Sequence, residues 1–302
     1  MKTDSDNLAK LETEQINPRT GELDRLSPLE LVKTLHKENH TVAPSIDFAV
    51  PVISEVVEEI VRRVKRGGRL LYIGAGTSGR LGVLDASECP PTFGVDPEMV
   101  KGIIAGGNKA LTTSIEGAED IEEEGAKDLR LHDLNETDTV IGIASSGRTP
   151  YVKGGLKYAR EVGAYAVALV NVSDSVIEKE ADQVIRALTG PEPITGSTRL
   201  KAGTAQKMIL NLITNSLMIR LGKVYGNLMI DLKASNSKLK DRAARIVMKA
   251  AGVERGKAES LLAESEGSSK LAILMALKNI DRDEAKKLLL EADGQIRKVL
   301  ES

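Results

Sequence analysis

The stretch RLLYIGAGTSG, residues 69–79, passes from a short apolar run into a loop of glycines and hydroxyl side chains. The apolar run has the length of a buried strand, and the residues after the loop keep a helical pattern to about Glu88. A strand, a glycine-rich turn and a helix in that order are typical of a parallel α/β unit. This stretch therefore predicts the kind of unit from which the fold is built.

Similar apolar runs recur along the chain and alternate with segments long enough for helices. The strand-like runs lie at 100–105, 139–144, 164–170 and 181–188, and the helical segments lie around 116–130, 150–162 and 173–179. Near-continuous apolar strands that alternate with helices are typical of a parallel sheet covered on both faces. The predicted fold class is α/β, with a five-stranded parallel sheet between two layers of helices.

Helical segments are expected on both sides of this sheet region. Ser27 and Pro28 have the pattern of a helix start, and apolar residues at helical spacing fill 49–65 and about 200–221. Beyond Lys238 the chain consists of short helical segments, which predicts a small C-terminal helical bundle. The expected domains are an N-terminal arm and helix at 1–48, the α/β domain at 49–238 and the helical domain at 239–302.

Composition narrows the classes of function. Aromatic residues make up 2% of the 302 residues and hydrophobic residues 41%, so there is little on which bases or sugar rings could stack. A formal charge of −2 gives no basic surface for nucleic acid. No apolar run has the length of a membrane span, Met1–Lys10 lacks the apolar stretch of a signal peptide, and a single cysteine fits a reducing compartment. We expect a cytoplasmic protein that holds its ligand with hydrogen bonds and charge.

The loop at 74–79 matches the pattern G-x-G-x-x-G, which in dinucleotide-binding folds cradles a pyrophosphate. Such folds also place an acidic residue at the end of the next strand, and here that strand ends in AGGN at 105–108. The loop instead offers Gly76, Thr77 and Ser78 at a helix start, which suits a compact phosphate. A tight turn with a hydroxyl helix cap is the alternative for this loop taken alone.

Two more loops carry similar chemistry. SSGRT at 145–149 is a second hydroxyl-rich helix start after a strand-like run, and the segment 190–207 brings hydroxyl and basic residues to the opening of the long helix. Because the carboxyl ends of parallel strands meet at one edge, the first two loops should converge on one anion, such as a phosphate monoester. A helix cap with solvated basic residues is the alternative for the third. The candidate binding residues are Gly76, Thr77, Ser78, Ser145, Ser146, Gly147, Thr149, Ser197, Thr198 and Lys201.

Longer motifs resemble known families. The loops at 74–79 and 145–149 resemble the sugar-isomerase (SIS) domain, a flavodoxin-like fold that binds phosphosugars, and 190–207 resembles a signature shared by bacterial N-acetylmuramic acid 6-phosphate etherases and glucokinase regulatory protein. The chain also resembles the etherase family itself, from its N-terminal arm to its C-terminal helices. The motifs are IGAGTSGRL at 73–81, DASECPP at 85–91, EGAED at 116–120, SGRTPY at 146–151 and GNLM at 226–229.

The etherase resemblance implies a carbon–oxygen lyase that acts in amino sugar catabolism and peptidoglycan recycling. The implied reaction cleaves the C3 lactyl ether of N-acetylmuramic acid 6-phosphate and yields N-acetylglucosamine 6-phosphate and D-lactate. Ring opening, removal of the C2 proton, loss of lactate and addition of water are the implied steps, with no metal or organic cofactor. The resemblance also implies Glu88 and Glu119 as the catalytic pair, a homodimer, and a C-terminal domain of the ubiquitin-associated type.

The roles of the two glutamates follow from their expected places in helices. Glu88 is expected to close a helix before Pro90 and Pro91, where the helix dipole favours a neutral acid, and Glu119 to lie in the first turn of another, where the dipole favours a carboxylate. Glu88 is then the proton donor and Glu119 the base. The alternatives are a surface residue for Glu88 and a solvated acidic helix face at 116–124.

Two other functions stay open at this point, a phosphosugar-sensing regulator without catalysis and an aldose–ketose phosphosugar isomerase. Release of D-lactate separates the etherase from both. His36 and His40 have the i, i+4 spacing of a zinc pair, but no third ligand is evident, and a solvated helix is the favoured interpretation. Cys89 has no histidine near it in sequence and is expected to be a buried thiol.

Overall fold

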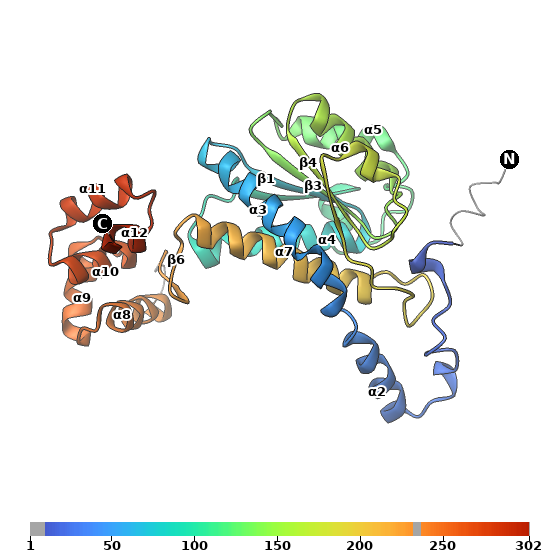
Figure 1. Cartoon of the computed structure of the whole chain (residues 1–302), viewed down its shortest axis with the longest axis horizontal. Helices are drawn as coiled ribbons and strands as arrows, with labels where there is room; N and C mark the ends of the chain where they lie inside the picture. The colour runs from blue at the N-terminus through green and yellow to red at the C-terminus, as the bar shows by residue number, and fades with distance from the viewer. Residues whose placement is uncertain (1–9, 232–236, 302) are drawn as a thin grey trace. The chain divides into compact units, whose positions relative to one another are not determined.

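The computed structural model describes residues 10–231 and 237–301, and its centre is a five-stranded parallel sheet (Figure 1). The strands are β1 (Leu70–Gly74), β2 (Val100–Ile104), β3 (Thr139–Ala144), β4 (Tyr165–Val170) and β5 (Gln183–Arg186). Their order is β2-β1-β3-β4-β5, as in flavodoxin-like sheets, so the winding reverses between β1 and β3. The predicted fold class is confirmed, and this reversal lies between the strands that carry the first two candidate loops.

Helices cover both faces of the sheet. Figure 1 shows α5 (Glu122–Leu131) and α6 (Pro150–Glu161) over one face, with α3 (Val50–Lys65), α4 (Gly76–Phe93) and α7 (Lys201–Arg220) on the other. Ser27 caps α2 (Pro28–Asn39) with the predicted capping box. The helix expected at 173–179 is wrong: the chain forms only the short 3-10 turn Ile177–Glu180, because Ile177 N donates to a loop carbonyl instead of continuing a helix.

Alternating side chains of β1 connect the two layers. Leu71 and Ile73 lie in the buried cluster formed with α5 and α6. Tyr72 points to the other face, where its hydroxyl donates a 3.0 Å hydrogen bond to Asp85 on α4. Since both faces of β1 are buried, its five residues are all apolar or glycine, which is why the strand was visible in the sequence.

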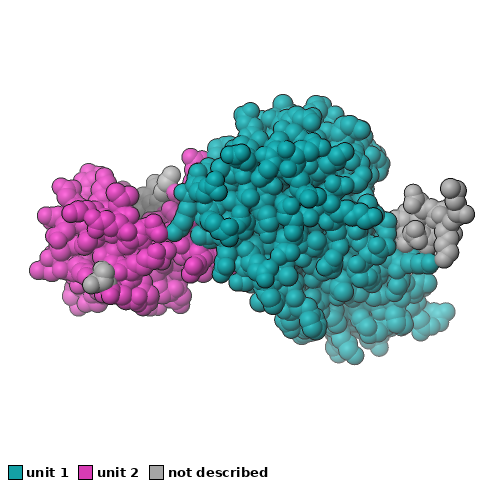
Figure 2. All heavy atoms as spheres, turned by 45° about the horizontal axis from the view of Figure 1, so that its top comes forward, with its two compact units in different colours: residues 1–87, 98–213 teal, residues 88–97, 214–302 magenta. Residues whose placement is uncertain are grey.

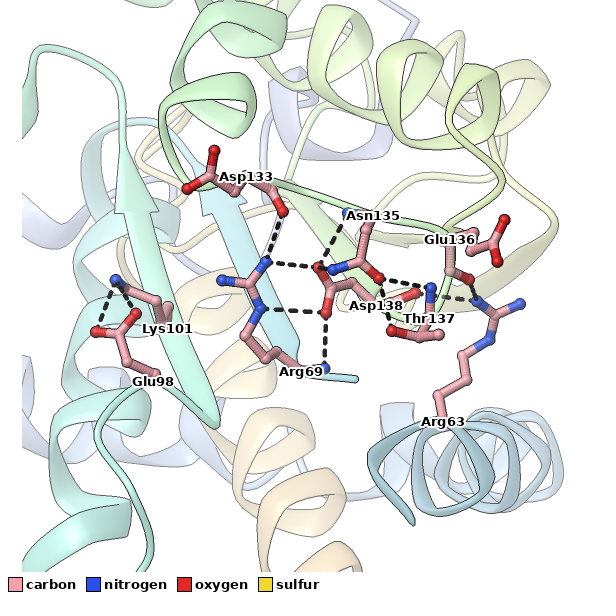
Figure 3. Close-up of polar contacts among 9 residues, drawn as sticks. All are labelled: Arg63, Arg69, Glu98, Lys101, Asp133, Asn135, Glu136, Thr137 and Asp138. Atoms are coloured by element: carbon pink, nitrogen blue, oxygen red, sulfur yellow. Dashed lines mark hydrogen bonds and ion pairs between the residues drawn. The ribbon is translucent and has the colours of Figure 1, made fainter. Parts of the chain in front are cut away.

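An ion pair joins β1 and β3 at the end of the sheet opposite the candidate loops (Figure 3). The Arg69 guanidinium donates to both carboxylate oxygens of Asp138, at 2.6 and 3.2 Å, and the Arg69 backbone N–H adds a third bond of 2.8 Å. Asp138 is fully buried, so these bonds and those from Asn135 replace the water that its carboxylate loses. The pair fixes where β1 and β3 begin.

The chain divides into two compact units, residues 1–87 with 98–213 and residues 88–97 with 214–302, coloured separately in Figure 2. The second contains the hairpin Val224–Tyr225 and Leu228–Met229, and the predicted C-terminal helices are present. They are α8 (Ser237–Ala251), α9 (Arg255–Glu264), α10 (Ser269–Lys278), α11 (Arg282–Glu291) and α12 (Ile296–Glu301). Their apolar residues form a core of their own, with Val247, Ile273 and Leu274 fully buried.

The N-terminal arm packs against the first unit where it is described. Thr13 and Asn17 are buried, and Thr20 Oγ1 donates a 2.9 Å hydrogen bond to the Pro193 carbonyl. The signal-peptide prediction concerns Met1–Lys10, of which residues 1–9 lie outside the described part. Among the helices of the described residues, none is both long enough and apolar enough to cross a membrane.

Candidate phosphosugar site

A buried glutamine links the two loops that follow β1 and β3. Ser78 Oγ donates a 2.9 Å hydrogen bond to Gln206 Oε1, and Gln206 Nε2 donates to Ser145 Oγ at 2.8 Å and to Asn171 Oδ1 at 2.9 Å. Gln206 and Asn171 are fully buried, and both serines are nearly so. A buried amide without partners costs about 1–3 kcal/mol, so the network favours one arrangement of both loops. The structure thus brings Ser78 and Ser145 together, as expected.

Two glycines of the first loop are required by close packing. A methyl group on Gly74 would lie 2.8 Å from Gly79 N, and one on Gly79 would lie 2.6 Å from the Gly74 carbonyl oxygen. The end of β1 and the first turn of α4 therefore touch backbone to backbone, which explains both glycines without a dinucleotide. At the start of α4, Gly76 is exposed and Thr77 half-buried.

The second loop is clamped at Gly147. Its carbonyl oxygen accepts hydrogen bonds from Ser175 Oγ at 3.1 Å and from the N–H groups of Val176 and Ile177 at 2.9 and 3.0 Å. Its φ is +62°, and a β-carbon there would lie 2.5 Å from Ser175 Cβ. Only glycine fits this position without moving the loop.

The helix start after this loop differs from the expectation. Pro150 has no N–H group, and Tyr151 N donates a 3.0 Å hydrogen bond to the Glu119 carbonyl, so α6 does not offer an open set of amides to an anion. Thr149 makes no side-chain cap to α6. Ser146 and Thr149 are half-buried, so the loop offers hydroxyls rather than helix N–H groups.

The start of α7 is already occupied by a carboxylate of the chain. Glu192 is fully buried, and its Oε2 and Oε1 accept the N–H groups of Lys201 at 2.8 Å and Ala202 at 2.9 Å. Burial raises the pKa of Glu192, and these two N–H groups act in the opposite direction. The N–H groups at the start of α7 are therefore satisfied by a carboxylate of the same chain.

Lys201 does not face an open site. Its side chain is fully buried, and its Nζ lies 3.3 Å from Glu38 Oε2, which also accepts bonds from Arg19 and Asn17. These partners lie more than 160 residues away in sequence, so the burial of Lys201 left no local signal. Its predicted contact with substrate is not supported by this placement.

Ser197 and Thr198 stay close to the first loop. Gly203 N donates to the Thr198 carbonyl at 2.9 Å, and a β-carbon on Gly203 would lie 3.3 Å from Thr77 Cγ2. The backbone carbonyl of Thr198 and the side chain of Thr77 therefore both lie beside the same face of Gly203. Ser197 and Thr198 are both half-buried.

A pocket opens beside the start of α4. Its walls come from Gly76 and Arg80, from Ala105 after β2, and from the loop 114–119, which ends at Glu119. Arg80 Nε donates a 3.1 Å hydrogen bond to the carbonyl of Leu111. The pocket thus combines two predicted site residues, Gly76 and Glu119, with the guanidinium of Arg80, which was not predicted to line it.

Glu119 does not lie in a helix. Helix α5 begins at Glu122, and Glu119 precedes it in a loop. The residue is exposed, yet protein atoms around the carboxyl raise its pKa, and the negative charges of Asp120 and Glu116 raise it further. The predicted stabilisation of an ionised Glu119 by a helix start is therefore wrong.

Glu88 does not close its helix. Helix α4 continues through Pro90 and Pro91 to Phe93, because two prolines in its last turn keep a helical φ. The Glu88 side chain is exposed, and Cys89 beside it is buried, as expected. The dipole argument that divided acid and base between the two glutamates therefore fails for both.

Four residues that shape this site were not predicted from the sequence. Gln206 and Asn171 are ordinary amides that bond to partners distant in sequence. Glu192 accepts the first N–H groups of α7, and the turn that brings it there has no signature in the sequence. Arg80 follows directly on the motif at 74–79, which was the one available signal.

Among the described residues, no three His, Cys, Asp or Glu side chains are grouped to hold a metal ion, and the Nε2 atoms of His36 and His40 lie 3.2 Å apart.

Comparison with known proteins first defines the class. Residues 52–160 match the glucokinase regulatory protein N-terminal SIS domain, and residues 116–216 match the SIS domain. A putative phosphosugar isomerase involved in capsule formation from Bacteroides fragilis is similar in structure, with a TM-score of 0.51 and 19% identity, over 67% of this chain and 95% of that chain. The fold is that of the SIS domain.

Relatives with higher identity define the family. The N-acetylmuramic acid 6-phosphate etherase of Histophilus somni is 55% identical over 269 residues, 89% of each chain. That of Oceanobacillus iheyensis is 55% identical over 291 residues, 96% of this chain and 99% of the relative. This chain belongs to the N-acetylmuramic acid 6-phosphate etherase family.

Proposed function

We propose that this chain cleaves the C3 D-lactyl ether of N-acetylmuramic acid 6-phosphate, giving N-acetylglucosamine 6-phosphate and D-lactate. The observation that carries the proposal is 55% identity to an etherase over almost the full length of both chains. The site supports it, since hydroxyl-bearing loops at the switch point of the sheet suit a phosphate monoester and a carboxylate lies beside them. The reaction belongs to amino sugar catabolism and peptidoglycan recycling, in the cytoplasm.

The chemistry requires only proton transfers. After ring opening, a base removes the C2 proton, which the C1 aldehyde acidifies. The C3–O bond then breaks, C2 and C3 become doubly bonded, and lactate leaves with a proton on its oxygen. Addition of water to C3 and return of a proton to C2 complete the conversion.

The proposed phosphate contacts are made by Gly76, Thr77, Ser78, Ser145, Ser146, Gly147 and Thr149, with Ser197 and Thr198 at the margin. Gln206 does not contact the phosphate; it holds Ser78 and Ser145 in position. Lys201 is left out of this set because its buried ammonium group is paired with Glu38.

Glu119 and Glu88 are the proposed catalytic pair, with roles opposite to those that the helix dipole suggested. The raised pKa of Glu119 suits the group that delivers a proton to the departing oxygen. Glu88 is then the carboxylate that removes the proton from C2.

The position of Glu88 favours a dimer. It follows Gly76 by twelve residues on α4, about 18 Å of helix at about 1.5 Å per residue, which is longer than one hexose phosphate. Leu84, one turn before Glu88, is an exposed apolar residue of the same helix face. We propose that two copies pair in a homodimer, with Glu88 of one acting in the site that holds Glu119 of the other.

Mixing inactive variants tests this arrangement. Refolding Glu88→Gln and Glu119→Gln chains together should restore about one quarter of wild-type activity, because half of the dimers are then mixed and each has one intact site. No recovery, in a mixture shown by native mass spectrometry to hold mixed dimers, would contradict shared sites.

Two other functions make different predictions. A phosphosugar-sensing regulator would bind ligand without turnover, and a phosphosugar isomerase would form a ketose phosphate. Release of D-lactate from N-acetylmuramic acid 6-phosphate supports the etherase against both.

A further inference from the structure

Arg80 is a cation of the candidate pocket whose charge no neighbour neutralises. In the described part of the chain, its one hydrogen bond runs from Nε to the Leu111 carbonyl, and no ion pair includes Arg80. That bond orients the guanidinium and leaves both Nη groups free to donate. Helix α4 carries Arg80 one turn after Gly76, so the charge lies next to the loop that the phosphate is proposed to use.

Arg80 is the cation of a pocket whose other charged side chains are acidic. Glu116 and Glu119 are the acidic side chains of its wall, and Arg80 is the basic one. Glu116 accepts a 3.1 Å hydrogen bond from Ser114 and does not pair with Arg80. An anionic ligand entering here would be repelled by the carboxylate of Glu116 unless Arg80 met it directly.

The substrate of the proposed reaction carries two anionic groups, a phosphate and the carboxylate of its lactyl ether. The loops after β1 and β3 supply hydroxyls for the phosphate, and the cation of the second loop, Arg148, is already paired with Asp174 at 3.1 Å. A guanidinium with two free Nη groups matches the two oxygens of a carboxylate.

We propose that Arg80 binds the lactyl carboxylate and thereby selects the ether substrate over phosphosugars that lack it. This inference rests on the proposed function. Held in this way, the ether oxygen faces the loop that bears Glu119, and the same contact stabilises lactate as it leaves. Arg80 is a specificity-determining residue, distinct from the two proposed catalytic glutamates.

The test compares two ligands that differ only in the lactyl group. KM for D-lactate release from N-acetylmuramic acid 6-phosphate and the inhibition constant of N-acetylglucosamine 6-phosphate are measured in the same assay for wild type, Arg80→Gln and Arg80→Lys. Arg80→Gln should raise KM by about 10- to 100-fold, the range for a lost charge-assisted bond, while the inhibition constant stays nearly unchanged. Arg80→Lys keeps the charge but loses the planar fork of the guanidinium, so its KM should lie between those of wild type and Arg80→Gln.

Lys109→Gln provides the matched control, because Lys109 is an exposed cation of the neighbouring turn and does not line the pocket. It should change neither constant. Equal weakening of both ligands by Arg80→Gln would assign Arg80 to the phosphate and overturn the inference, as would no effect on either. A wild-type protein that releases no lactate would instead overturn the proposed function, so the two failures are distinct.

Discussion

Ser78 donates a 2.9 Å hydrogen bond to Gln206, a residue 128 positions later in the chain. Through the same amide the bond extends to Ser145 and Asn171, so the loops after β1, β3 and β4 share one buried partner. Phosphate contacts proposed for two separate loops depend on this side chain, which makes Gln206 a positioning residue.

Replacement of Gln206 by Leu should lower the free energy of unfolding by about 1–3 kcal/mol, because polar groups at Ser78, Ser145 and Asn171 lose a buried partner. KM should rise more than kcat falls, since the loops position the phosphate. Urea denaturation and steady-state kinetics measure both. Gln183→Leu is the control, because the Gln183 amide bonds to Glu55 at the exposed surface; equal effects of the two variants would remove the special role of Gln206.

Alanine at Gly147 should destabilise the protein by more than alanine at Gly107. Both glycines have a positive φ, +62° and +66°, but a β-carbon at 147 also meets Ser175, whereas nothing lies within 4 Å at 107. Gly107→Ala should cost about 1–2 kcal/mol of backbone strain. Gly147→Ala should add about 1–3 kcal/mol of overpacking and weaken binding of N-acetylglucosamine 6-phosphate. Denaturation midpoints and calorimetric binding test this, and equal losses would contradict the clamped loop.

The pH profile of kcat/KM should report the raised pKa of Glu119. The limb of the profile that reflects Glu119 should lie at higher pH than an ordinary glutamate gives. Asp120→Asn should move that limb to lower pH, because loss of the neighbouring negative charge favours ionisation of Glu119. Glu123→Gln removes the same charge from an exposed position on α5 and should leave the limb in place. A profile unchanged by Asp120→Asn would mean that this limb does not reflect the ionisation of Glu119.

Glu38 should make stability sensitive to acid. Hydrogen bonds from Arg19, Asn17 and Lys201 lower its pKa from 4.5 to about 2 despite burial. Because the folded pKa lies below the unfolded one, this stabilisation is present above about pH 4.5 and is lost as the pH falls towards 2, a change of about 3 kcal/mol. The difference in unfolding free energy between wild type and Glu38→Gln should shrink over that window. A difference that is constant with pH would contradict the pairing, and Glu58→Gln, an exposed carboxylate on α3, is the control.

The sheet and the first two loops were predictable because they depend on local pattern. Continuous burial gives β1 and β3 apolar runs, and Gly74 and Gly79 are required by their close contact with each other. The convergence of Ser78 and Ser145 followed from parallel strands alone.

Predictions that depended on distant partners or exact helix ends were less accurate. Lys201 was assigned to substrate because Glu38 and the arm that buries it are remote in sequence. Glu88 was placed at a helix end because prolines usually stop helices, yet in the last turn of α4 they fit. Helix α5 starts three residues beyond Glu119, which reverses the expected electrostatics of that carboxyl.

The proposed etherase activity is measured as release of D-lactate from N-acetylmuramic acid 6-phosphate, followed with D-lactate dehydrogenase. We expect one D-lactate and one N-acetylglucosamine 6-phosphate per substrate consumed, with oxygen-18 from labelled solvent water at C3 of the sugar. Binding of the substrate without lactate release, or formation of a ketose phosphate in its place, would contradict the proposed activity.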